Sequence, residues 1–178
     1  MRKMIKSVFV IFLGFVALVC VACEKKYVIA KEKISLAKTV LSEVEFENSE
    51  KVKLNQQDDE WIVSGEIESM SVAQKSAFGV DGVTHIVVFK FEFDNERTID
   101  YFKIDGETVK VFATDKNVEG YIGSISELLD NEPGEDAFCY LVLSANTKEY
   151  DITSRYTDGT ESVISLKIES TLSSANAE

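Results

Sequence analysis

The chain has 178 residues, of which 45% are apolar, and its 19 basic and 31 acidic residues give a formal net charge of −12. Such an acidic surface repels nucleic acid, so we expect no nucleic-acid partner. The apolar content and the varied sequence exclude a wholly disordered chain, and the length suits one folded domain with short extensions.

Residues 1–22 have the form of a secretory signal peptide. Three basic residues fall within the first six positions, and the uncharged run that follows, residues 7–22, is rich in Val, Ile, Leu and Phe. A basic start followed by an apolar run is typical of secretory signals. A spanning helix needs about 20 apolar residues, and because this run is a little shorter we expect cleavage rather than a permanent span.

The sequence C-V-A-C at residues 20–23 resembles the lipobox of bacterial lipoproteins. The resemblance is confined to the signal region and implies that a diacylglyceryl group is attached to the thiol of Cys23 and that the chain is cut just before it. Cys20 stands where the family usually has Leu, and it is the alternative acceptor. Ala22 suits the small-residue site before the cut better than Val19 does, so we favour Cys23.

Two other interpretations of this segment exist, a C-x-x-C redox or metal pair and an uncleaved N-terminal helix. A redox pair inside an apolar signal, without a second cysteine pair, is disfavoured. With Cys23 lipidated, Cys139 is the one other cysteine of the mature chain, which excludes an internal disulfide. Two or more acyl chains hold a protein stably at a membrane, so the resemblance implies an extracytoplasmic protein anchored to the cell membrane by lipid.

Cleavage before Cys23 leaves 156 residues, of which 16 are basic and 31 acidic, a net charge of −15. No cluster of lysine or arginine offsets this charge, so we expect the lipid to be the sole membrane attachment. We interpret residues 23–32 as lipid anchor and tether, residues 33–170 as a single β-rich domain, and residues 171–178 as a disordered tail.

The domain begins with a helical pattern. Ile34, Ala37, Leu41 and Val44 recur at spacings of 3, 4 and 3, which predicts a helix over residues 33–44. An alternation that begins at Val44 leaves a strand start as the alternative.

Beyond this segment the apolar residues alternate, as is typical of strands. Residues 60–69 predict a half-buried strand that pairs with residues 51–56, and Gly65 within it indicates a bulge or a close neighbour. Residues 84–94 give the strongest strand, with its three phenylalanines on the face that we expect in the core.

The dipeptides Asp105-Gly106 and Asp158-Gly159 each separate two alternating runs. Because Gly and Asp tolerate positive φ, each dipeptide predicts a β-hairpin, the first with a two-residue type I′ turn. Residues 137–145 are apolar on both faces, which predicts a central strand. Residues 124–132 predict a short helix.

About eight strands with short connections predict a mostly-β domain in which two packed sheets hide the apolar faces. The strand pattern, with Pro133-Gly134-Glu135 before the central strand, resembles the immunoglobulin-like domains of bacterial surface lipoproteins. The resemblance implies an antiparallel immunoglobulin-like sandwich with one short N-terminal helix, although the Cys…Trp…Cys framework of true immunoglobulin domains is missing. The alternative is an α+β fold with the helix packed on a curved antiparallel sheet.

Few residues offer catalytic chemistry. His85, the only histidine, lies at the end of an apolar strand face, and we interpret it as a core or rim residue. Cys139 alternates with leucines, and we interpret it as an inert buried thiol. No phosphate loop, G-x-S-x-G or H-E-x-x-H motif occurs. We therefore expect no enzyme, no cofactor and no metal site, but a non-catalytic interaction module that contacts an envelope protein or glycan. An enzyme that uses carboxylates alone is the least favoured hypothesis.

Acidic turns and tyrosines are the remaining candidates for binding. Carboxylates cluster at residues 58–60, 94–96 and 130–136, where they could ligate Ca²⁺, although their spacing is not that of an EF-hand. The alternative function is therefore a small-ligand or calcium-binding lipoprotein. Four tyrosines at strand or turn positions could instead serve recognition: Tyr101, Tyr121, Tyr150 and Tyr156.

Overall fold

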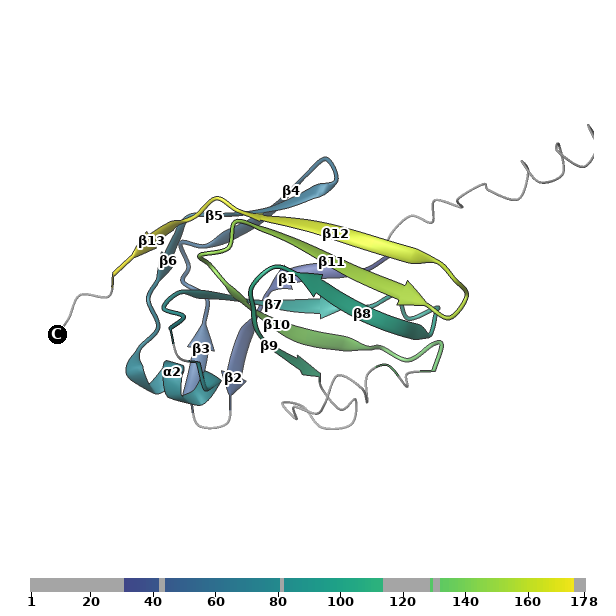
Figure 1. Ribbon diagram of the computed structural model, residues 1–178, viewed down its shortest axis with the longest axis horizontal. Helices are drawn as coiled ribbons and strands as arrows, with labels where there is room; N and C mark the ends of the chain where they lie inside the picture. Colours follow the sequence, from purple (N-terminus) through teal and green to yellow (C-terminus); the bar gives the residue numbers. More distant parts are fainter. Residues whose placement is uncertain (1–30, 42–43, 81, 114–128, 130–131, 175–178) are drawn as a thin grey trace, which may run out of the picture.

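The computed structural model describes residues 31–41, 44–80, 82–113, 129 and 132–174, which form two packed β-sheets, two short ribbons and a short helix (Figure 1). In chain order the elements are β1 (Lys33–Leu36), β2 (Lys38–Leu41), β3 (Val44–Glu47), β4 (Lys53–Gln57), β5 (Glu60–Ser64), β6 (Glu66–Glu68), α2 (Val72–Phe78), β7 (Ile86–Glu92), β8 (Ile99–Asp105), β9 (Thr108–Ala113), β10 (Phe138–Ser144), β11 (Glu149–Tyr156), β12 (Glu161–Ile168) and β13 (Thr171–Ser173). The four-stranded sheet has the order β1-β7-β10-β9, and the five-stranded sheet has the order β4-β5-β12-β11-β8. The ribbons β13-β6 and β2-β3 lie toward the same end of the molecule as α2.

The two sheets pack face to face around one core, which confirms the mostly-β sandwich predicted from the sequence. On β7 the predicted inward face is correct, because Val87, Phe89 and Phe91 are fully buried. The ring centroids of Phe91, from the four-stranded sheet, and Phe102, from β8 of the five-stranded sheet, lie 5.4 Å apart. Burial of each side chain of this size contributes roughly 1.5–3 kcal/mol, so these rings tie the sheets together.

A second apolar cluster covers the outer side of the four-stranded sheet. β10 lies between β7 and β9, and its two faces contact different clusters: Leu141 lies in the core between the sheets, and Val142 lies in the second cluster. The prediction of a central strand covered on both faces is confirmed. Phe78 of α2 is fully buried in the second cluster, which holds the helix against the sheet.

The helix predicted over residues 33–44 is wrong. Lys33–Leu36 is strand β1, which pairs antiparallel with β7, and Lys38–Leu41 is β2, which pairs with β3. Ile34 lies in the core between the sheets, whereas Ala37 lies in the second cluster. In an extended chain, residues three positions apart point to opposite faces. The spacing of three from Ile34 to Ala37, which would keep both on one face of a helix, therefore puts them on opposite faces of the sheet.

A helix lies instead at α2, between β6 and β7. The hydroxyl of Ser71 accepts a hydrogen bond from the Gln74 N–H, and the Gln74 side chain accepts one from the Ser71 N–H, which together form a capping box. Gly79 ends the helix in the left-handed conformation, with a φ of 61°. The S-x-x-Q pattern is the sequence signal for this helix start.

The hairpin predicted at Asp105-Gly106 is also wrong. β8 pairs with β11 in the five-stranded sheet, whereas β9 pairs with β10 in the four-stranded sheet, so the chain crosses between sheets at this dipeptide. Gly106 has a φ of 131°, and a Cβ there would lie 2.3 Å from Cδ1 of Tyr150. The absence of a side chain at Gly106 therefore lets the ring of Tyr150 pack against the backbone, and the glycine does not form a two-residue turn.

The other predicted pairings are confirmed. β11 and β12 form an antiparallel hairpin around Asp158-Gly159, and β4 pairs antiparallel with β5. Gly65 has the close neighbour expected of it, because a Cβ there would lie 1.9 Å from the carbonyl oxygen of Lys51. β12 also pairs with β5 in parallel, which departs from a purely antiparallel sandwich.

The ordered domain extends past the predicted boundary at residue 170, because Thr171–Ser173 is strand β13 and pairs in parallel with β6. The predicted disorder is therefore wrong for this part of the tail. The signal peptide, Cys23 and nearly all of the helix predicted at residues 124–132 lie outside the described residues. Within the described part of the chain, no helix is long and apolar enough to cross a membrane.

Candidate functional site

The side of the five-stranded sheet that faces away from the core is exposed, and we call it the outer face. Residues of β11 and β12 largely alternate between buried and exposed, as expected when one face packs on a core and the other meets solvent. β12 presents Val163, which is 53% exposed, and β8 presents Tyr101, which is 37% exposed. The strand register places these residues on the outer face: Lys53, Asn55, Gln57, Glu60, Ile62, Ser64, Tyr101, Lys103, Asp105, Glu149, Asp151, Thr153, Arg155, Glu161, Val163, Ser165 and Lys167.

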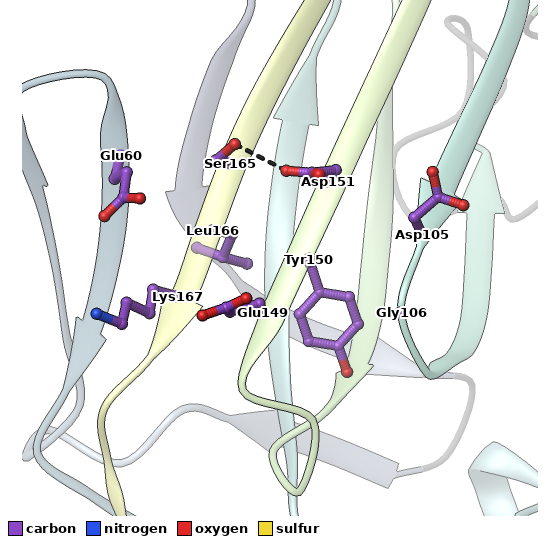
Figure 2. A pocket seen from close by; sticks show the side chains of 9 residues that line it. All are labelled: Glu60, Asp105, Gly106, Glu149, Tyr150, Asp151, Ser165, Leu166 and Lys167. Atoms are coloured by element: carbon purple, nitrogen blue, oxygen red, sulfur yellow. Dashed lines mark hydrogen bonds between the residues drawn. The ribbon is translucent and has the colours of Figure 1, made fainter.

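A shallow depression of about 380 Å³ lies in one half of the outer face (Figure 2). The strand register places Asp151 between Ser165 of β12 and Asp105 of β8, and Ser165 pairs in turn with Glu60 of β5. The Ser165 hydroxyl donates a hydrogen bond of 2.7 Å to Oδ1 of Asp151. Carboxylates from β5, β8 and β11 thus surround the depression.

Two lysines of the outer face are held by carboxylates of the same chain. Nζ of Lys167 lies 3.0 Å from Oε1 of Glu169, and chiefly this hydrogen bond raises the pKa of Lys167. Nζ of Lys103 lies 2.8 Å from Oδ2 of Asp105, and this hydrogen bond raises the pKa of Lys103. Both ammonium groups therefore remain charged and already have a partner.

Three carboxylates around the depression have no such partner. Among the described residues, no lysine or arginine forms an ion pair with Glu60, Glu149 or Asp151. Lys167 lies near enough to Glu60 and Glu149 for both carboxylates to help raise its pKa, so the negative charge of this half is offset in part. Because these groups meet solvent, their interaction with any partner depends on the salt concentration.

The other half of the outer face combines an aromatic ring with a guanidinium group. The guanidinium carbon of Arg155 lies 5.9 Å from the ring centre of Tyr101, and the Tyr101 hydroxyl donates a hydrogen bond of 3.4 Å to Oε1 of Glu161. Val163 lies two residues further along β12. Tyrosine and arginine are enriched in protein interfaces, so this half has the composition of an interface.

A second depression, of about 740 Å³, lies where the chain enters the domain. Lys31, Lys33, Lys90 and Phe138 are among the residues that line it. Nζ of Lys90 lies 2.6 Å from Oε1 of Glu92 and 4.4 Å from the ring centre of Phe138. The Lys90 ammonium is thus held by a carboxylate and by an aromatic face.

A buried charged network lies beside this second depression. The Glu32 side chain is fully buried, and it accepts hydrogen bonds from the hydroxyls of Tyr156 and Ser162. Nη2 of Arg97 lies 3.6 Å from Oε1 of Glu32, and Nε of Arg97 lies 2.7 Å from Oδ2 of Asp94. Burial, followed by the bond to Glu32, raises the pKa of Tyr156, so its hydroxyl keeps the proton that it donates.

His85 and Cys139, the two single residues considered for catalysis, both have structural roles in the fold. His85 is half-buried, with Nδ1 2.8 Å from Oγ1 of Thr84 and Nε2 2.8 Å from the carbonyl oxygen of Ser173. Cys139 is fully buried on β10, and burial raises the pKa of its thiol far above the ordinary range, which disfavours the reactive thiolate. The interpretations of His85 as a rim residue and of Cys139 as a buried thiol are confirmed.

Two of the predicted acidic turns come together in space. Nδ2 of Asn95 donates a hydrogen bond of 3.1 Å to Oδ1 of Asp136. Asp94 is occupied within its own turn, because its carboxylate accepts from the Glu96 N–H at 2.9 Å and from Nε of Arg97 at 2.7 Å. Among the described residues, no three His, Cys, Asp or Glu side chains are grouped so that they could hold a metal ion.

The tyrosines considered for recognition lie in different environments. Tyr150 and Tyr156 are buried with hydrogen-bonded hydroxyl groups, so they are not available to a partner. Tyr101 lies on the outer face, and Tyr121 lies outside the described residues. Of these candidates, the structure brings Tyr101 to the same face as the unpaired carboxylates.

Sequence reasoning missed both the outer face as a unit and the pairing of Glu32 with Arg97. The alternation along β12 indicates an exposed side, but it does not show which strands align their exposed sides. No local pattern links Glu32 to Arg97. No family model matches the chain, and neither a curated protein nor a solved structure matches it.

Proposed function

We propose that the protein is an extracytoplasmic lipoprotein, anchored to the cell membrane by lipid on Cys23, whose β-sandwich serves as a non-catalytic interaction module. The outer face of the five-stranded sheet makes the contact. The partner is another macromolecule of the cell envelope, either a protein or a glycan.

The exposure of Val163 is the observation that carries this proposal. This β-branched residue is 53% exposed on β12, opposite Thr153 of β11 and outside the Ser165–Ile168 stretch that pairs with β5. Small molecules are usually held in concave pockets that bury most of their surface. A broad sheet face with only a shallow depression suits a macromolecular partner better.

A photo-crosslinking amino acid at position 163 of the full-length protein, in its own membranes, tests the proposal. We expect a discrete cross-linked product, because this position lies within the contact. Val72 is the matched control, since it is the same residue type and is 86% exposed on α2. Products at neither position, or equal products at both, would rule out the outer face as the contact.

The second depression supports the alternative function, a small-ligand lipoprotein. Its volume of about 740 Å³ lies in the range of ligand sites, and Lys33, Asn95 and Phe138 offer a charge, an amide and an apolar wall. A thermal-shift panel of sugars and of Ca²⁺ tests this function. A stabilising ligand whose effect is lost in Phe138→Ala would support it, and no shift with any member of the panel would count against it.

A further inference from the structure

We infer that the second depression binds a neutral saccharide, with the apolar face of one sugar ring packed against Phe138. The inference rests on the alternative function proposed above, since it names the class of small ligand that the same site takes. The depression is lined by strands of the four-stranded sheet and not by the outer face, so its ligand is independent of the macromolecular contact.

Three neighbouring strands of the four-stranded sheet present the wall of the depression. The strand register aligns Lys33 of β1, Glu92 of β7 and Phe138 of β10 across the sheet. Cys139, the next residue of β10, lies in the core between the sheets, so Phe138 faces outward. The ring of Phe138 is half-buried, and it lines the depression together with the two charged side chains.

Ion pairs within the chain already satisfy most of the charges around the depression. Nζ of Lys90 lies 2.6 Å from Oε1 of Glu92, and Nζ of Lys31 is bound by Glu96. A charged ligand would therefore meet groups of both signs and would compete with existing ion pairs. The lining residues and their ion-pair partners together carry a net charge of −1, from Lys31, Lys33, Lys90 and Arg97 against Glu32, Glu92, Asp94, Glu96 and Asp136.

The same groups offer hydrogen bonds to a neutral polar ligand. Exposed ammonium groups donate and exposed carboxylates accept. Asn95 adds an amide, whose Nδ2 donates a hydrogen bond of 3.1 Å to Oδ1 of Asp136, and both residues line the depression. An apolar ligand would leave such groups without hydrogen bonds, at a cost in free energy.

Phe138 supplies the apolar surface that a ligand meets. The other apolar residues of the lining, Phe93 and Ala137, are only 5% and 3% exposed. A pyranose ring carries C–H groups on its faces and hydroxyl groups around its edge. It therefore fits one aromatic side chain that is surrounded by hydrogen-bond donors and acceptors.

Phe138 is also held in place before a ligand binds. Its ring centre lies 5.8 Å from that of Tyr140, with the ring planes 84° apart, and Nζ of Lys90 lies 4.4 Å from the centre of the Phe138 ring. An aromatic surface and an ammonium donor are thereby presented together in fixed positions. Such preorganisation lowers the entropic cost of ordering side chains around a ligand.

The proposed anchor gives such a sugar two sources. Lys31, which lines the depression, comes eight residues after Cys23. A fully extended segment of this length spans at most about 29 Å, so lipid on Cys23 would keep the depression near the membrane surface. The ligand is thus a neutral sugar ring that belongs either to a free glycan or to the headgroup of a glycolipid.

Calorimetry on the full-length lipidated protein, in a non-ionic detergent that carries no sugar, measures the binding of free disaccharides. The neutral probes are diacetylchitobiose, maltose and cellobiose, and the charged probes are chitobiose, a cation, and digalacturonate, an anion. We expect a neutral disaccharide to bind at least about threefold more tightly than either charged probe. A charged probe that binds as tightly as every neutral one would overturn the inference.

Substitution of Phe138 locates the site. Phe138→Ala should weaken the bound disaccharide at least about tenfold, whereas Phe138→Trp should retain it. Tyr101→Ala is the matched control, because it removes an exposed aromatic ring from the other sheet, and it should change binding less than about twofold. Equal effects of Phe138→Ala and Tyr101→Ala would overturn the site.

A second variant covers the case in which circular dichroism shows that Phe138→Ala does not fold. Asn95→Ala removes an exposed polar group of the depression and leaves the core unchanged. It should weaken the disaccharide at least about threefold, and unchanged binding would count against the site.

Reconstitution in phosphatidylcholine vesicles, with and without diglucosyl diacylglycerol, distinguishes the two sources. A melting temperature that rises with the glycolipid, but not in Phe138→Ala, assigns the sugar to a headgroup, and binding of free disaccharides without this rise assigns it to a free glycan. Both results support the inference, whereas a rise that persists in Phe138→Ala would overturn it. A response to Ca²⁺ without any response to sugars would overturn it and leave the small-ligand function intact, and no response to any probe would overturn both.

Discussion

The carboxylate of Glu32 and the hydroxyl of Tyr156 are hydrogen-bonded inside the sandwich, although Glu32 directly precedes β1 and Tyr156 ends β11. The guanidinium carbon of Arg97 lies 3.8 Å from the ring centre of the same tyrosine and faces the same carboxylate. The first described residues are therefore fixed by a buried network rather than by strand pairing alone. The lipid anchor that we propose on Cys23 would therefore be joined to a part of the domain that is held rigidly.

Replacement of Arg97 by Met should lower the free energy of unfolding by about 3–5 kcal/mol. The change leaves the carboxylates of Glu32 and Asp94 buried without their cation, and an unpaired buried charge is strongly destabilising. Urea unfolding followed by circular dichroism measures the loss. Arg155→Met is the matched control, because Arg155 is exposed and its Nε lies 3.9 Å from Oδ2 of Asp100. It should cost less than about 1 kcal/mol, and equal losses in both variants would contradict the importance of the buried network.

Gly65→Ala should be more destabilising than Gly134→Ala. Both glycines have positive φ, 107° and 91°, so each substitution carries a backbone strain of about 1–3 kcal/mol. A Cβ at Gly65 would also lie 1.9 Å from the carbonyl oxygen of Lys51, whereas a Cβ at Gly134 has nothing within 4 Å. The difference between their melting temperatures isolates the clash. Similar melting temperatures would mean that the backbone around Lys51 moves easily.

Much of the fold could be predicted because most strands show an alternation of apolar and polar residues within a few neighbouring positions. The alternating phenylalanines of β7 lie in the core as predicted, and Asp158-Gly159 lies in the turn of the predicted hairpin. These features depend on neighbouring residues, and the sequence displays them directly.

The failures come from contacts that are distant in the chain. Ile34 and Ala37 show a helical spacing, but pairing with β7 holds the segment extended. Asp105-Gly106 has the sequence of a tight turn, but β8 and β9 find partners in different sheets. The outer face was unpredictable for the same reason, because the order of the strands decides which exposed residues become neighbours.

Stability should fall at alkaline pH through Tyr150. Burial raises the pKa of Tyr150 from 10.0 to about 12, and its hydroxyl lies 2.6 Å from the carbonyl oxygen of Ser144. Because the folded pKa lies above the unfolded value, the stabilising contribution is complete below pH 10.0 and is lost as the pH rises to about 12. The melting temperature should fall across this window, and less steeply in Tyr150→Phe. Tyr156, whose pKa burial also raises, should leave a residual slope in that variant.

Lipid attachment should depend on Cys23 and not on Cys20. Metabolic labelling with a radioactive fatty acid should be lost in Cys23→Ala and retained in Cys20→Ala, because Ala22 suits the site before the cut and Val19 does not. The mature domain is too acidic to bind anionic headgroups through charge, so the Cys23→Ala protein should leave the membrane fraction once its signal is removed. Labelling that survives in Cys23→Ala and disappears in Cys20→Ala would move the acceptor to Cys20. Membrane association that persists without any label would instead favour an uncleaved N-terminal helix, whose apolar run could hold the protein without lipid.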